Sequence, residues 1–212
     1  MNALLAVACA LAVGSWVSPE ARTVRVAAGS GGIVTVSEQS FDRMFTGSTA
    51  TYDLATRMLL SGSIHASCCG GRWTSTVARN GDGTYDVTKV TDTFNLTDAE
   101  HMHYHGLPPG AFVTFGSDRL IPWIVAKQHP AQIYAIDINP LHFRQLTVAD
   151  SHLAPPAGVP KGDRVLAMSS WDSPQGKRTT YLWYDPCTFS VDAEGSDAEH
   201  ALIYEPDPKT SP

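Results

Sequence analysis

Hydrophobic and polar residues alternate along several short stretches of the chain, a pattern typical of β-strands with one buried face. The longest stretch covers residues 84–95, where Tyr85 and Val87 lie on one face and Asp86 and Thr88 on the other. An Asn-Gly-Asp-Gly sequence precedes it, and because these residues tolerate positive φ, we expect a hairpin with residues 72–78. Similar patterns predict short strands over residues 23–28, 33–37, 111–115, 132–138, 164–171, 179–184, 188–192 and 202–204.

Apolar residues recur at helical spacing in other parts of the chain. Residues 49–60 carry apolar side chains three and four positions apart, and Gly62 is placed to end a helix there. Residues 40–45 fit one helical turn, and the segment 61–71 reads as a loop of small residues. Pro122 suits the first turn of another helix, which we expect to continue through residue 127.

The segment after the longest predicted strand carries a helix-start signal. Thr97 and Glu100 have the spacing of a capping box, and Gly106 is placed to end the helix. We therefore expect a short helix over residues 98–105. The whole pattern predicts an α+β fold, in which a mostly antiparallel β-sheet of short strands packs with three or four short helices.

The beginning of the chain is apolar. Residues 3–14 form a run of signal-peptide length, followed by small residues. This pattern predicts a signal peptide over residues 1–21, a single α+β domain over 22–205 and a mobile tail over 206–212. A secreted, extracellular protein follows from this interpretation. Because no basic residue precedes the run, the alternatives are a buried first helix or a misassigned start.

Composition narrows the classes of partner. The chain has 212 residues and a net charge of −6, and it contains no basic run. This composition predicts no nucleic-acid footprint. The apolar run at the start is too short for a stable membrane span. We expect a monomer that acts on a small-molecule or protein substrate.

Four cysteines are present, and one lies within the predicted leader. The other three are Cys68, Cys69 and Cys187. Three cysteines permit one disulfide, and a bond from Cys187 to Cys68 or Cys69 would fit an oxidising compartment.

Three of the eight histidines stand on alternate residues, at His101, His103 and His105. The predicted helix would place His101 and His105 one turn apart, a spacing that can bind a divalent metal ion when a carboxylate completes the site. In a strand, all three imidazoles would share one face. The alternative without a metal is a solvated segment.

The middle of the chain resembles enterotoxin-type mono-ADP-ribosyltransferases. The resemblance rests on the sequence FVTFGS at residues 112–117, followed by a predicted helix and by IYAI at residues 133–136. It implies a toxin-like or effector-like transferase that acts on NAD. Its implied catalytic residues are Arg25, in the position of the family's first-strand arginine, and Asp163, beside the position of its catalytic acid. Its implied substrate-binding residues are Thr114, Ser117 and Tyr134.

A second, shorter resemblance involves Asp92 and His101. They keep the spacing of the Asp-x-Tyr-Asp-x5-His-Arg motif of colicin M-type lipid II phosphodiesterases, which implies catalytic roles for both residues. A metal-dependent hydrolase using the histidines is a further alternative. The remaining hypothesis, from a different class, is a non-catalytic secreted binding or structural protein.

Overall fold

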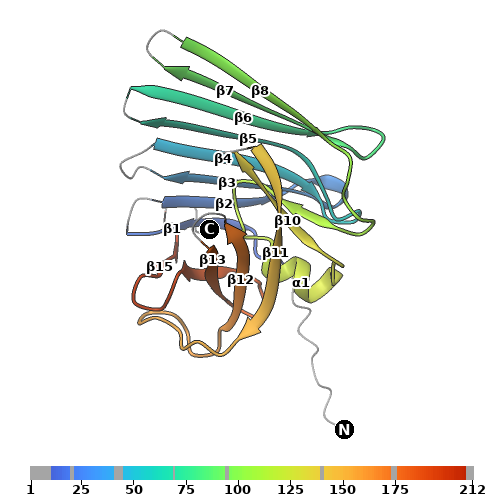
Figure 1. Ribbon diagram of the computed structural model, residues 1–212. Helices are drawn as coiled ribbons and strands as arrows, with labels where there is room; N and C mark the ends of the chain where they lie inside the picture. Colours follow the sequence, from blue (N-terminus) through green and yellow to red (C-terminus); the bar gives the residue numbers. More distant parts are fainter. Residues whose placement is uncertain are drawn as a thin grey trace.

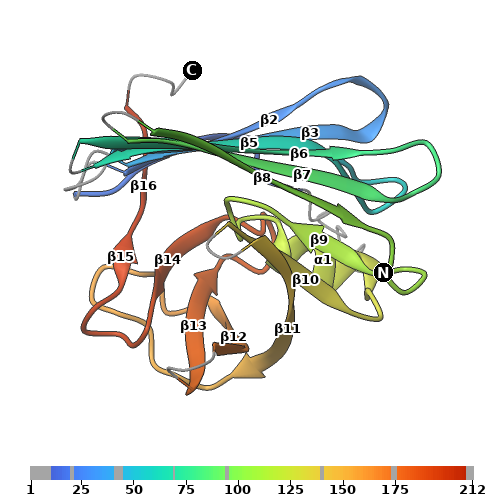
Figure 2. The ribbon, with the colours of Figure 1, turned by 45° about the horizontal axis from the view of Figure 1, so that its top comes forward.

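Two β-sheets account for most of the computed structural model, which describes residues 11–19, 22–40, 45–68, 70–93, 96–138, 141–172 and 176–208. One sheet has nine strands in the order β16-β1-β2-β3-β4-β5-β6-β7-β8, and the other has seven in the order β15-β14-β13-β12-β11-β10-β9. Figure 1 shows the nine-stranded sheet as a continuous layer whose strands follow one another along the chain. Figure 2 shows the seven-stranded sheet as a curved second layer beneath it.

The nine-stranded sheet is antiparallel throughout. Alternate residues of its strands face the second sheet, as Val24 and Val26 do, while Arg25 between them is exposed. The β6–β7 hairpin turns at Gly83, whose φ is +91°. Its strands are β1 (Gly14–Val17), β2 (Arg22–Ala28), β3 (Ile33–Ser40), β4 (Phe45–Asp53), β5 (Met58–Cys68), β6 (Gly71–Arg79), β7 (Tyr85–Thr93), β8 (Leu96–Tyr104) and β16 (Glu205–Pro206).

The seven-stranded sheet contains one parallel pair, β9 with β10, which are joined through the α-helix α1 (Ile121–Gln128). Pro122 lies in the first turn of α1, and His129 ends the helix with a φ of 46°. The other neighbours in this sheet are antiparallel. Its strands are β9 (Phe112–Thr114), β10 (Ile133–Ile138), β11 (Leu141–Ser151), β12 (Arg164–Asp172), β13 (Gly176–Tyr184), β14 (Val191–Gly195) and β15 (Leu202–Ile203).

The main hydrophobic core lies between the two sheets. The rings of Tyr52 and Phe112, one from each sheet, stack with centroids 5.6 Å apart. A second, smaller core covers the opposite face of the seven-stranded sheet. Leu166 belongs to the main core and its neighbour Val165 to the second one, because successive residues of a strand point to opposite faces. Both faces of this sheet are therefore covered over β12, β13 and β14.

The predicted α+β class is wrong, because the structure is mostly β and α1 is the single α-helix among the residues described. Residues 49–60 belong to β4, a turn and β5. Tyr52 and Leu59 are cross-strand neighbours in register, so they reach the same core from two strands. Asp53 Oδ1 accepts a hydrogen bond from the backbone amide of Ala55, which favours the turn over a helix. Most of the predicted loop at 61–71 extends β5.

The predicted helix at residues 98–105 is also wrong, because this segment belongs to β8. The two capping-box residues have partners on β7 instead of on their own backbone. Thr97 donates a hydrogen bond to Asp92 at 2.7 Å, and Lys89 contacts Glu100 at 3.0 Å. The hairpin at residues 79–83 and the helix starting near Pro122 are confirmed. Of the turn predicted at 40–45, residues 41–44 lie outside the described residues.

The predicted leader contains a strand, and the predicted tail contains the last residue of another. Within residues 1–21, β1 pairs with both β2 and β16, while residues 1–10 lie outside the described part. Within residues 206–212, Pro206 ends β16 opposite Trp16. Among the residues described, no helix is both long enough and apolar enough to cross a membrane.

Candidate ligand pocket

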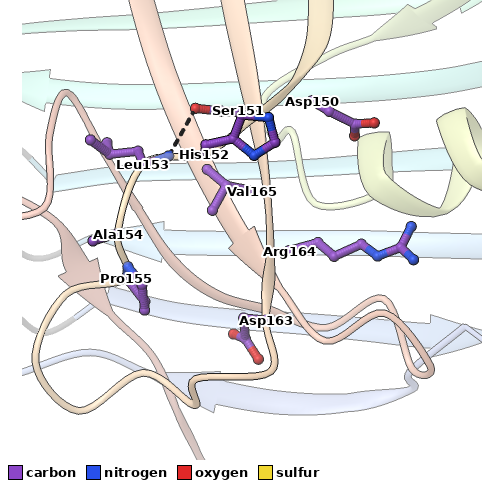
Figure 3. Close-up of a pocket in the computed structure, with 9 residues that line it drawn as sticks. All are labelled: Asp150, Ser151, His152, Leu153, Ala154, Pro155, Asp163, Arg164 and Val165. Atoms are coloured by element: carbon purple, nitrogen blue, oxygen red, sulfur yellow. Dashed lines mark hydrogen bonds between the residues drawn. The ribbon is translucent and has the colours of Figure 1, made fainter.

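A pocket of about 430 Å³ opens at one end of the seven-stranded sheet. Figure 3 shows its lining, which comes from the end of β11, the segment that follows, and the start of β12. The pairing of Ser151 with Val165 places these two strand ends side by side. The volume lies in the range of small-molecule sites, which is about 300–1,000 Å³.

The segment between β11 and β12 is held in place by local contacts. The backbone amide of Leu153 donates a hydrogen bond to Ser151 Oγ at 3.3 Å. Val159 and Asp163 each close a turn, with backbone hydrogen bonds to Pro156 and Pro160 at 3.2 Å. Val159 is also buried in the second core. These contacts and the prolines restrict the segment, so the pocket is formed before any ligand arrives.

Charges of both signs line the pocket. Asp150 and Arg164 are exposed on one side, and His152 is exposed beside them. The charges of Asp150 and Arg164 also affect the pKa of the nearby Tyr184 hydroxyl. Burial raises the pKa of Tyr184, the Arg164 guanidinium opposes this rise, and the Asp150 carboxylate adds to it.

Asp163 is the unusual group of the pocket. Burial, together with the charge of the neighbouring Asp192 carboxylate, raises the pKa of Asp163 to about 7, and Asp185 adds a smaller repulsion. The Asp163 carboxyl group shares a side-chain hydrogen bond with Asp192, which also raises its pKa, while its buried Oδ2 atom has no hydrogen-bond partner among the residues described. Burial also raises the pKa of Asp192. A carboxyl group with a pKa raised in this way can exchange a proton near neutral pH or bind a cation.

A second group of ionisable side chains lies between the sheets. Arg22 on β2 contacts Glu194 on β14 at 2.5 Å and Glu38 on β3 at 3.4 Å. The Tyr204 hydroxyl donates a hydrogen bond to Glu194 at 3.0 Å. Arg119 is buried with its guanidinium 3.6 Å from the Tyr204 ring centroid. We call these five residues the interior charge network.

Two acids of this region have raised pKa values. Burial and the charges of Glu194 and Glu38 raise the pKa of Asp118 to about 6. Burial and Glu194 also raise the pKa of Glu38, while Arg119 and Arg22 act in the opposite direction. The cavity beside Arg119 has a volume of only about 10 Å³, enough for no more than a water molecule. This cavity therefore offers no room for a ligand.

The residues implied by the transferase resemblance do not all come together. Thr114 and Ser117 are adjacent, because the buried Thr114 hydroxyl donates a hydrogen bond to the Ser117 carbonyl at 2.5 Å. Tyr134 lies on the neighbouring strand and donates to the Gln132 side chain. Arg25 is exposed on the outward face of β2, and Asp163 lies in the pocket of the other sheet.

Asp92 and His101 are also separated. His101 stands opposite Thr88 on β7, and Asp92 lies four residues further along β7, which corresponds to about 13 Å. His101 and His105 are separated by a similar length of chain, not by one helical turn. Among the described residues, no group of three or more His, Cys, Asp or Glu side chains is placed to hold a metal ion.

The predicted disulfide lies largely outside the described residues. Cys187 is exposed in the turn between β13 and β14. Cys69 and the side chain of Cys68 belong to the part of the chain that is not described. The disulfide therefore stays a prediction.

Sequence reasoning missed most of the pocket and the whole interior charge network. The signal for the pocket was present: charged residues flank a proline-rich segment between two strands, at Asp150, His152, Asp163 and Arg164. Asp163 was found only through the family resemblance. The partner of Asp163 at Asp192, and the pairs of Arg22 with Glu38 and Glu194, bring distant strands together and have no local signal.

No protein-family model matches the chain, and no curated protein or solved structure is significantly similar to it.

Proposed function

We propose that the chain is a secreted binding protein whose ligand is a small polar molecule with a cationic group, bound in the pocket beside Asp163. The observation that carries this proposal is the Asp163 carboxyl group, which lines a pocket of about 430 Å³ and lies beside the carboxyl groups of Asp192 and Asp185. A ligand amine would supply the positive charge that this group lacks. The apolar run at residues 3–14 supports secretion.

The charges around Asp163 favour a cation. Asp192 and Asp185 both raise its pKa, so the site carries more negative charge than Asp163 alone. Arg164 and Asp150 line the pocket as well. The ligand group that Asp163 selects is the amine. Because the cation favours the ionised carboxylate, its binding should strengthen as the pH rises through about 7.

The test is a chemical-shift titration of the ¹⁵N-labelled chain with propylammonium ion, using propanol as the uncharged probe of similar size. We expect propylammonium, and not propanol, to shift the backbone amides of Ser151, Leu153 and Val165. Asp163→Asn should abolish these shifts, whereas Asp150→Asn should leave most of them. Equal shifts with the two probes, or shifts that persist in Asp163→Asn, would contradict the proposal.

An enzyme is the second candidate, favoured by the pKa of Asp163 near 7, which suits a general acid or base. The ADP-ribosyltransferase-like activity remains a prediction here, with Asp163 as its acid and NAD as substrate. If the prediction holds, the purified chain should release nicotinamide from NAD, and Asp163→Asn should lose that activity. An unchanged rate in this variant would remove Asp163 from any such mechanism.

A further inference from the structure

The β8 strand places three imidazoles on the outward face of the nine-stranded sheet. His101 and His103 are cross-strand neighbours of Thr88 and Asp86 on β7, and His105 follows the last residue of β8. All three histidines are exposed. The even-numbered residues of β8 point to the opposite face, where Tyr104 stacks on Phe143 of β11 with ring centroids 4.0 Å apart.

The ring of His103 is held by a carboxylate behind it. His103 Nδ1 lies 2.5 Å from Asp86 Oδ1. An ionised carboxylate only accepts hydrogen bonds, so Nδ1 carries the proton, and the lone pair of the neutral ring is on Nε2. A histidine whose Nδ1–H is bound by a carboxylate is the usual arrangement of a metal ligand that coordinates through Nε2.

The neighbouring ring is close to a coordinating position. The ring centroids of His103 and His105 are 5.8 Å apart. Two imidazoles bound to one tetrahedral ion through bonds of about 2 Å have ring centroids about 5 Å apart. Small side-chain rotations, which cost little for exposed residues, would close this difference. The separation of the two rings is therefore already close to the one that a shared ion requires.

We propose that His103 and His105 form an open surface site for a divalent transition-metal ion, with Asp86 as the positioning residue behind His103. Water molecules complete the coordination, so the site needs no third protein ligand. Imidazole ligands select Cu²⁺, Ni²⁺ and Zn²⁺ over Mg²⁺ and Ca²⁺. The carboxylates of Asp86 and Asp82 add a negative field near the rings, since both interact with His103.

His101 is the third imidazole on this face, and its interactions make it a poorer metal ligand than His103. Its Nδ1 lies 3.1 Å from Thr88 Oγ1, so the ring is held by a hydroxyl instead of a carboxylate. It stands two residues from His103 on the same face of the strand. We assign it no bond to the ion.

The experiment is a calorimetric titration of the full chain with Cu²⁺, Ni²⁺ and Mg²⁺ at neutral pH, after purification without a histidine tag. We expect saturable binding of one ion, tighter for Cu²⁺ than for Ni²⁺, and no binding of Mg²⁺. The double variant His103→Gln/His105→Gln should lose saturable binding. Asp86→Asn should keep it with an affinity about 10–100-fold lower, as for other partners behind metal ligands.

A matched control exists elsewhere on the surface. His200 is exposed, and its Nδ1 lies 2.9 Å from Asp197 Oδ1, so it is a histidine–carboxylate pair at a second position. His200→Gln should leave the affinity unchanged. Paramagnetic broadening by Cu²⁺ should be centred on the amides of His103 and His105. Absence of saturable binding to the unmodified chain, binding that survives the double variant, or an equal loss in His200→Gln would each overturn the assignment.

Discussion

Replacing Arg119 should reveal how strongly the interior charge network holds the two sheets together. Arg119 is 5% exposed, donates a hydrogen bond to the Val191 carbonyl at 2.6 Å, and covers the ring of Tyr204. It also offsets the negative charge of Glu38. In Arg119→Met most of the side-chain volume is kept, so the change removes charge and hydrogen bonds without opening a large cavity.

Three losses contribute to the expected effect. The hydrogen bond from a charged donor is worth about 1.5–3 kcal/mol, and a desolvated cation–π contact about 2 kcal/mol. Glu38 also loses the favourable charge of Arg119, although Arg22 still pairs with it. These contributions overlap, and the buried Nε and Nη2 atoms of Arg119 have no hydrogen-bond partner among the described residues, so removing them offsets part of the loss. We therefore expect the free energy of unfolding to fall by about 2–4 kcal/mol at pH 8.

The pH dependence follows from the acids that remain. The folded-state pKa of Asp118 is about 6, above its value of about 4 in an unfolded chain. The folded state therefore binds more protons, and stability falls as the pH rises through this interval. Without Arg119 the repulsion among the ionised acids is larger, so the deficit of the variant should be smaller at pH 5 than at pH 8 by about 1 kcal/mol or more.

Urea unfolding followed by tryptophan fluorescence, at pH 5 and pH 8, measures both effects. Arg25→Met is the matched control, because Arg25 is exposed on the outward face of β2, and we expect a change within about 0.5 kcal/mol. Adding Glu38→Gln to Arg119→Met should recover part of the stability. A loss below about 1 kcal/mol for Arg119→Met, or an equal loss at the two pH values, would refute the reasoning.

Three further changes test other parts of the structure. Asp118→Asn should stabilise the chain at pH 8, by up to about 3 kcal/mol, and have little effect at pH 4, because it removes a charge whose pKa burial raises to about 6; a thermal melt at each pH measures this. Gly116→Ala should cost about 2–4 kcal/mol in urea unfolding, because a Cβ at its φ of +72° would lie 2.7 Å from Ser48 Cβ, whereas Gly110→Ala, at a φ of +77° in open space, should cost only about 1–2 kcal/mol. Phe143→Ala should lower the hydrogen-exchange protection of β8 more than that of β3, because Phe143 stacks on Tyr104; equal effects on both strands would contradict this.

The sequence predicted elements whose signals are local. The β6–β7 hairpin followed from alternation and an Asn-Gly turn, and α1 followed from Pro122. The failures came from residues whose partners lie on another strand. Tyr52 and Leu59 have helical spacing, yet they meet across a hairpin. Thr97 and Glu100 have the spacing of a capping box, yet their side chains bind Asp92 and Lys89 on the neighbouring strand β7.

The candidate site was predictable only in part, for a related reason. Asp163 could be named because of its place in a family resemblance, but its raised pKa depends on burial in the folded chain and on Asp192 of β14. The interior charge network was beyond prediction, because Arg22 and Glu194 are 172 residues apart. The helical pairing of His101 with His105 was wrong, because β8 is a strand whose polar residues pair with those of β7.

The pairing of β1 with β16 has a consequence for the order in which the chain folds. The first described strand has β2 on one side and the last strand on the other, so this border of the nine-stranded sheet is finished only when nearly the whole chain is available. The hairpins from β2 to β8 can form as their residues emerge, since each joins neighbours in sequence. The contact of β1 with β16 and that of Arg22 with Glu194 must instead close loops longer than 150 residues. Closure of such loops is slow, so we expect a late folding phase that is lost when β16 is removed.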